Sequence, residues 1–61
     1  MNIKENISKL LFDSGLSNYK ISKDTGIAQT TLGRFTTKKS DIDNMSLGNA
    51  IKLNEYYSRL A

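Results

Sequence analysis

The side chains of this sequence that could do chemistry are amides, hydroxyls and basic groups, and they gather between residues 18 and 39. That stretch holds five basic residues and one acid, although the whole chain carries a net charge of only +3. The forked ends of Gln29 and Arg34 can each make paired hydrogen bonds to a flat polar partner. The pattern therefore favours recognition through hydrogen bonds and positive charge.

Catalysis and metal binding are both disfavoured by what the chain lacks. It contains no His and no Cys, and its two Glu residues, Glu5 and Glu55, lie far apart in the sequence. The commonest general base and the commonest zinc ligands are thus missing, and no glycine-rich phosphate loop is present. We expect no enzyme activity, no metal, no cofactor and no small-molecule ligand.

Length and composition predict one small domain spanning residues 1–61. A chain of 61 residues can bury only about 60% of the surface that its unfolded form exposes. Proline is absent, which suits helices joined by short turns. There is no long apolar run and no signal peptide, so we expect a cytoplasmic protein that does not enter a membrane.

Two predicted helices separated by a glycine must position the polar groups. Ser17 is placed to cap a helix that begins at Asn18, because its hydroxyl can accept from the free N–H groups of the first turn. Gly26 follows about two turns later, where a left-handed residue ends a helix. Ile27 would then pack back onto Ile21.

A second helix is predicted from about Ala28 to Thr36. Its apolar positions, Ala28, Leu32 and Phe35, share one face. The opposite face consists of Gln29, Thr30, Gly33, Arg34 and Thr37. That face has no acid, and its glycine leaves the middle without a side chain, so it could come close to another surface. The alternative is an ordinary amphipathic helix with a solvated polar face.

The order of these features resembles the helix-turn-helix of the lambdoid phage repressor and Cro family, also called XRE-type. The positions that carry the resemblance are Ile21, Ser22, Gly26, Ile27, Leu32 and Phe35. The motif would span approximately residues 18–36. Two positions depart from the family, since Asn18 stands where Gln is common and Ala28 where a Ser or Thr cap is common. Loss of such a cap costs about 1 kcal/mol.

The resemblance implies an all-α, compact, lambda-repressor-like domain of four or five helices. It also implies roles in binding double-stranded DNA for residues that match the family's positions. Gln29, Thr30 and Arg34 would read bases, because Gln suits adenine, Arg suits guanine and a Thr methyl can touch the thymine methyl. The phosphate contacts would be Asn18, Lys20, Thr31, Thr37, Lys38 and Lys39.

Several of these assignments have alternatives that the sequence leaves open. The basic residues could form a solubilising face, although their place beside the motif favours phosphate contact. Tyr19 could bind a phosphate or cover the first helix, and Thr31 could be buried.

Flanking helices complete the predicted fold. The first would be capped by Asn2, with Glu5 three residues on, and would end near Ser14 with Gly15 behind it. Its apolar positions are Ile3, Ile7, Leu10 and Leu11. After the second motif helix, a polar loop would be anchored to the core by Ile42.

The last helix, capped by Ser46, carries two apolar stripes. One comprises Leu47, Ala50, Ile51, Asn54 and Tyr57, and the other comprises Leu53, Tyr56 and Leu60. One stripe is enough for the domain's own core, so we interpret the second as a candidate dimer surface. The alternative is that the wide apolar arc tucks under the first helix.

The function implied by the resemblance is transcription regulation by sequence-specific binding of double-stranded DNA. The expected protein is a Cro-like repressor of a phage, plasmid or mobile element that occludes a promoter. It would act as a homodimer, at least on its operator. A fragment of a larger repressor would have the same features. The hypothesis from another class is a protein-interaction module on the same fold, such as an antitoxin or a phage-encoded inhibitor.

Overall fold

The computed structural model describes residues 2–60, and their regular structure is helical throughout. The α-helices are α1 (Ile3–Ser8), α2 (Asn18–Thr25), α3 (Gln29–Thr36) and α4 (Leu47–Leu60). A π-helical turn, η1 (Lys9–Asp13), continues α1, and a 3-10 turn, η2 (Ile42–Asn44), precedes α4. The prediction of an all-α domain is confirmed, with four α-helices rather than five among the described residues.

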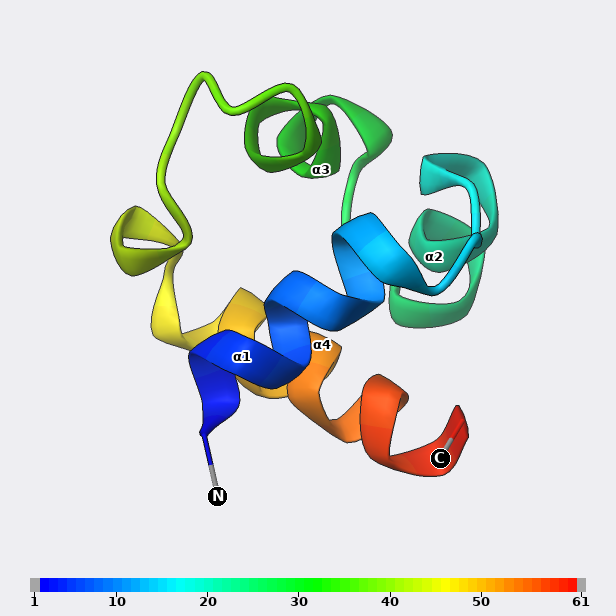
Figure 1. Cartoon of the computed structure of the whole chain (residues 1–61). Coiled ribbons are helices and arrows are strands. Elements are labelled where there is room, and N and C mark those ends of the chain that lie inside the picture. The colour runs from blue at the N-terminus through cyan, green and yellow to red at the C-terminus, as the bar shows by residue number, and fades with distance from the viewer. Residues whose placement is uncertain (1, 61) are drawn as a thin grey trace.

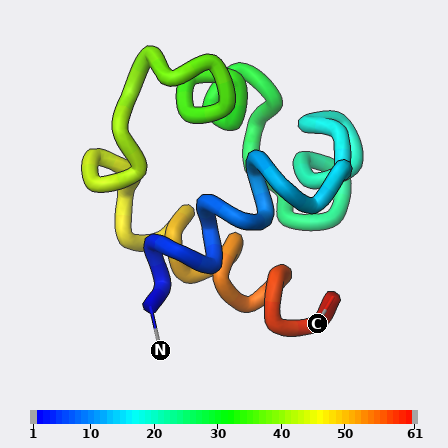
Figure 2. Tube along the Cα trace, in the orientation of Figure 1, coloured from blue at the N-terminus to red at the C-terminus, as the bar shows by residue number. Residues whose placement is uncertain are grey.

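The helices form two pairs around a shared core. Helices α1 and α4 cross the lower part of the molecule in Figure 1, running in the same general direction, while α3 lies above them and α2 to one side. The Asn6 side-chain amide donates to Asn54 Oδ1 at 3.0 Å and ties α1 to α4. The chain leaves α3, descends along the outside through η2 and enters α4, as the tube in Figure 2 shows.

The boundaries of α2 follow the predicted capping chemistry. Ser17 Oγ accepts from the Lys20 N–H at 3.1 Å, so it caps the first turn. Gly26 adopts a left-handed conformation with φ of +80°, and its N–H donates to the Ser22 carbonyl. Because α3 begins at Gln29, only three residues separate the two helices.

The first helix differs from a uniform α-helix. Asn2 Oδ1 accepts from the Glu5 N–H, as predicted, but the helix widens into η1 after Ser8. Within η1, Leu10 and Leu11 are buried whereas Phe12 is 42% exposed. Gly15 then has a φ of +77°, in agreement with its predicted place behind the end of the helix.

One core joins all four α-helices. Its fully or largely buried members are Ile7, Leu10, Leu11, Ile21, Ile27, Leu32, Phe35, Leu53 and Tyr56. Ile42 is packed against them and anchors the loop before α4, as predicted. Ala28 is exposed, contrary to the prediction, because its backbone is not helical and it lies just before the first turn of α3.

The assignment of the two stripes on α4 was wrong in part, because Ala50 and Tyr57 of the first stripe do pack against the core. Leu53 and Tyr56 enter the core, whereas Leu47 is 74% exposed and Ile51 is 44% exposed. The reason is the position of α2, since α4 turns its Tyr56 side toward that helix as well as packing against α1. Thus the alternative, in which the apolar arc is covered within the domain, holds for Leu53 and Tyr56.

A polar contact at the edge of the core joins α4 to α2. The Tyr56 hydroxyl donates to Asp24 Oδ2 at 2.6 Å, and the Lys20 ammonium pairs with the same oxygen at 3.0 Å. The Tyr56 hydroxyl, followed by Lys20, holds the pKa of Asp24 below its ordinary value. The ionised carboxylate is therefore favoured in the folded state more than in the unfolded chain.

We predict that Tyr56→Phe reduces the acid sensitivity of the fold. A lowered pKa for folded Asp24 contributes stability above the unfolded pKa of about 4, and that contribution is lost as pH falls through the folded pKa. Urea unfolding midpoints at pH 7 and pH 3 measure the loss. Wild type should lose more stability against urea between pH 7 and pH 3 than Tyr56→Phe or Asp24→Asn. The two variants should still lose some, because their other acids still titrate. Equal losses in all three proteins would contradict the assignment.

Candidate nucleic-acid interface

The outward face of α3 presents the three residues predicted to read bases. Gln29, Thr30 and Arg34 are exposed, while Leu32 and Phe35 are buried on the opposite side of the same helix. Thr30 and Arg34 are four residues apart, so they lie on one face about 6 Å apart along the axis. The structure therefore brings an amide, a hydroxyl and a guanidinium together without an acidic residue on this helix.

Gly33 lies in the middle of that helix without a packing reason to be glycine. A Cβ atom built on Gly33 would meet nothing within 4 Å, and its conformation is helical. Glycine inside a helix costs about 0.5–1 kcal/mol relative to alanine. The fold therefore gains nothing evident from this glycine, which leaves room beside Arg34 for another surface.

Asn18 joins the start of α2 to the end of α3. Its side-chain amide donates to Thr36 Oγ1 at 3.2 Å, and both residues are half-buried. The side chain is shorter than the Gln common in the resembled family, yet it reaches across the gap between the helices. Asn18 therefore braces α3 against α2 through this hydrogen bond.

Lys20 lies apart from this group. Its ammonium is held by Asp24, whose other partner is Tyr56 on α4, whereas Asn18 on the same helix is bonded to α3. Residues 20 and 24 are one turn apart and share the α4 side of α2. In this structure Lys20 thus lies on the flank of α2 nearer α4, where its side chain is 54% exposed. Its predicted phosphate contact stays a prediction.

The remaining predicted phosphate contacts lie on α3 or just after it. Thr31 is half-buried, and the Thr37 hydroxyl donates to the Gly33 carbonyl at 2.6 Å. Lys39 is exposed. Lys38 has a left-handed φ of +63°, and its ammonium lies 5.7 Å from the centre of the Phe12 ring.

Phe12 was missed by sequence reasoning. It lies next to the apolar stripe of the first helix but does not belong to it, so periodicity gave no reason to single it out. Its contact with Lys38 joins η1 to the turn after α3 across 26 positions of the sequence. A local pattern contains no signal for such a pair.

Most of the predicted dimer surface is buried inside the domain. Leu53 is fully buried and Tyr56 is 7% exposed, so neither can meet a second copy without unfolding α4 from the core. Leu60 is 50% exposed and lines an open groove of about 340 Å³ with Ser14, Leu16 and Tyr57. Any dimer contact must use exposed side chains such as Leu60.

No helix among residues 2–60 combines the length and apolar character needed to cross a bilayer. Nor do these residues contain a group of three or more His, Cys, Asp or Glu side chains that could hold a metal ion.

Comparisons with known proteins add no assignment to this geometry. A scan against protein-family models, a search of curated proteins and a search of solved structures each found no match. The functional interpretation therefore depends on the residues and arrangement of α2 and α3.

We predict that Asn18 and Thr36 are energetically coupled. In a double-mutant cycle of Asn18→Ala and Thr36→Val, the coupling free energy of unfolding should be about 0.5–1.5 kcal/mol, the usual contribution of a hydrogen bond. Urea unfolding of the four proteins measures it. A cycle of Asn18→Ala with Thr37→Val is the control, because Thr37 bonds to Gly33 instead. Equal coupling in the two cycles would contradict the brace.

Proposed function

We propose that this protein is a sequence-specific regulator that binds double-stranded DNA with α3 in the major groove. Gln29, Thr30 and Arg34 would contact base edges, and the chain after α3 would contact the backbone. The observation that carries the proposal is the outward face of α3, where exposed forked and hydroxyl groups surround a glycine with open space above it. A helix of this kind can approach base edges closely enough for direct hydrogen bonds.

The arrangement around α3 supports the same proposal. Helix α2 is joined to α3 by three residues, which is the connection of a helix-turn-helix. Asn18 holds the two helices together at their far ends. Such a brace matters for recognition because base contacts depend on the orientation of the reading helix.

The proposed backbone contacts are revised by the position of Lys20. Lys38 and Lys39 follow α3, with Thr37 at its end and Asn18 at the start of α2, where free N–H groups favour a phosphate. Lys20 is left out of this group because its ammonium pairs with Asp24 on the α4 side of α2. Contacts of this type set register and orientation but carry no sequence information.

The proposed mode of action is Cro-like repression by promoter occlusion. Two copies on a pseudo-palindrome would place their α3 helices about one helical turn, or 34 Å, apart. We place the protein in the cytoplasm of a cell carrying a phage, plasmid or other mobile element, where it occupies an operator as a homodimer. The proposal includes the case in which this domain belongs to a larger repressor.

One observation favours a second candidate, a protein-interaction module. Leu47 and Ile51 lie one turn apart on α4 and are both exposed, so they form an apolar strip on one face. An antitoxin or a phage-encoded inhibitor could use such a strip against a partner protein. In that case Leu47→Asp would abolish activity, whereas substitutions on α3 would not.

The test is selection of bound sequences from a random duplex pool, with elution in salt high enough to strip non-specific complexes. We expect a two-fold symmetric consensus. On that duplex Gln29→Ala should relax preference at one base position, since one bidentate pair is worth about 1–3 kcal/mol of discrimination. Lys39→Ala should weaken binding to all sequences and lower the salt slope by about one ion.

Two results would count against the proposal. Recovery of no consensus would favour the protein-interaction module. Equal, sequence-independent losses for Gln29→Ala and Lys39→Ala would remove the assignment of base contact to Gln29.

We further predict that Gly33→Ala raises the stability of the fold but lowers its affinity for DNA. The free energy of unfolding should rise by about 0.5–1 kcal/mol, because alanine is the better helix former and its Cβ meets no protein atom. Affinity for the selected duplex should fall by about tenfold, since overpacking a close contact costs about 1–3 kcal/mol.

Gly48 provides the matched control. It lies in the first turn of α4, and a Cβ there also meets nothing within 4 Å. Gly48→Ala should leave DNA affinity unchanged, as measured by fluorescence anisotropy. If Gly33→Ala bound DNA as tightly as Gly48→Ala, α3 would not approach DNA closely at Gly33.

A further inference from the structure

Lys38 occupies a backbone conformation that lysine rarely adopts. It is the one residue other than glycine with a positive φ among residues 2–60. The turn is nevertheless secured to α3, because the Lys38 N–H donates to the Phe35 carbonyl and the Ser40 N–H donates to the Arg34 carbonyl at 3.0 Å. These two bonds tie the backbone at Lys38 and Ser40 to the last turn of α3.

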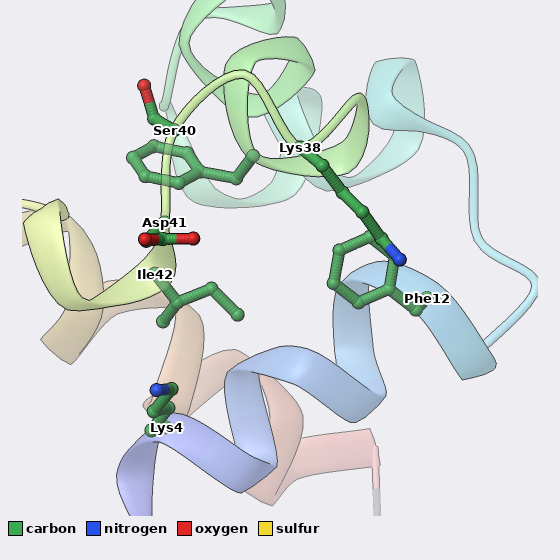
Figure 3. Close-up of a pocket in the computed structure, with 7 residues that line it drawn as sticks. Lys4, Phe12, Lys38, Ser40, Asp41 and Ile42 are labelled. Carbon is green, nitrogen blue, oxygen red and sulfur yellow. The ribbon is translucent and has the colours of Figure 1, made fainter.

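This conformation directs the Lys38 side chain back toward the first helix. Figure 3 shows the chain running from the turn after α3 to the ring of Phe12 on η1. The ammonium lies 5.7 Å from the ring centroid, within the distance of about 6 Å at which a cation is attracted to an aromatic face. Phe12 is 42% exposed and Lys38 is exposed as well, so the contact lies open to solvent.

The π-helical turn explains why Phe12 is available. Two consecutive residues that precede it in η1 are buried, Leu10 and Leu11. The widened turn thus places both of these side chains in the core and leaves that of Phe12 at the surface. Phe12 is not a member of the buried core, and its exposed face is the one available to the Lys38 ammonium.

The neighbouring cavity does not offer a competing explanation. Phe12 and Lys38 line an open pocket together with Lys4, Phe35, Ser40, Asp41 and Ile42. Its volume of about 190 Å³ is below the 300–1,000 Å³ of typical small-molecule sites. Lys4 at its far side is already paired with Asp43 at 2.9 Å.

We propose that Phe12 is a positioning residue that holds the Lys38 ammonium ready for a DNA phosphate next to the end of α3. This inference rests on the proposed function and extends the DNA-facing surface from the helix pair α2–α3 onto η1. A free lysine side chain loses rotamer freedom when it binds a phosphate. The ring of Phe12 removes part of that loss in advance, because it already restricts the ammonium to one side of the turn.

The test is a double-mutant cycle on affinity for the duplex selected above, measured over a range of salt concentrations. Phe12→Leu should weaken binding about two- to fivefold, which corresponds to an exposed cation–π contact. Its salt slope should stay that of wild type, because the charge is still present. Lys38→Ala should lower the slope by about one ion.

The effect of Phe12→Leu in two variant backgrounds distinguishes positioning of Lys38 from general damage to the fold. In the Lys38→Ala background, Phe12→Leu should have no further effect on affinity, whereas in the Lys39→Ala background its effect should persist. Phe12→Tyr keeps an aromatic face and should bind like wild type, and Phe12→Gln should behave like Phe12→Leu. Circular dichroism and urea unfolding confirm that each variant is folded before binding is compared.

Failure of this inference can be distinguished from failure of the proposed function. If wild type binds a selected sequence but Phe12→Leu has no effect, or has the same effect with and without Lys38, Phe12 does not position that lysine. If wild type selects no sequence, the proposed function fails, and the role of Phe12 at a DNA phosphate fails with it.

Discussion

Leu32 of α3 and Leu53 of α4 are both fully buried in a core of nine apolar side chains that all four α-helices share. The chain contains no cysteine for a disulfide, and a domain of this length buries only about 60% of its unfolded surface. Each buried face therefore also determines which face remains outside. On α3, burial of Leu32 and Phe35 leaves Thr30 and Arg34 to project outward, so the core orients the candidate interface.

Polar contacts then hold α2 between its two neighbours. On one flank the Asn18 amide bonds to Thr36 of α3, and on the other Asp24 accepts from Tyr56 of α4. Such bonds are directional, so they add to the definition of helix orientation that apolar packing provides. A regulator of the proposed kind needs that definition, because a small rotation of α3 would move every base contact at once.

Much of the helix pair could be predicted from the sequence because its determinants are local. Ser17 caps a helix through an N–H group three residues away, and Gly26 ends it because glycine adopts the left-handed conformation without a steric cost. The same holds for Leu32 and Phe35, whose spacing alone indicates a shared buried face. By contrast, the left-handed conformation of Lys38 could not be predicted, since lysine gives no local preference for it.

The sequence by itself determined that the chain is helical, where α2 begins and ends, where α3 ends, and which face of α3 is polar. Only the tertiary structure decided which members of the two α4 stripes are buried, because two apolar stripes on one helix are equivalent until its neighbours are in place. Leu53 and Tyr56 pack into the core, with the Tyr56 hydroxyl bonded to Asp24 of α2, and this arrangement leaves Leu47 exposed. Local periodicity specifies the faces of a helix, but packing against distant segments selects among them.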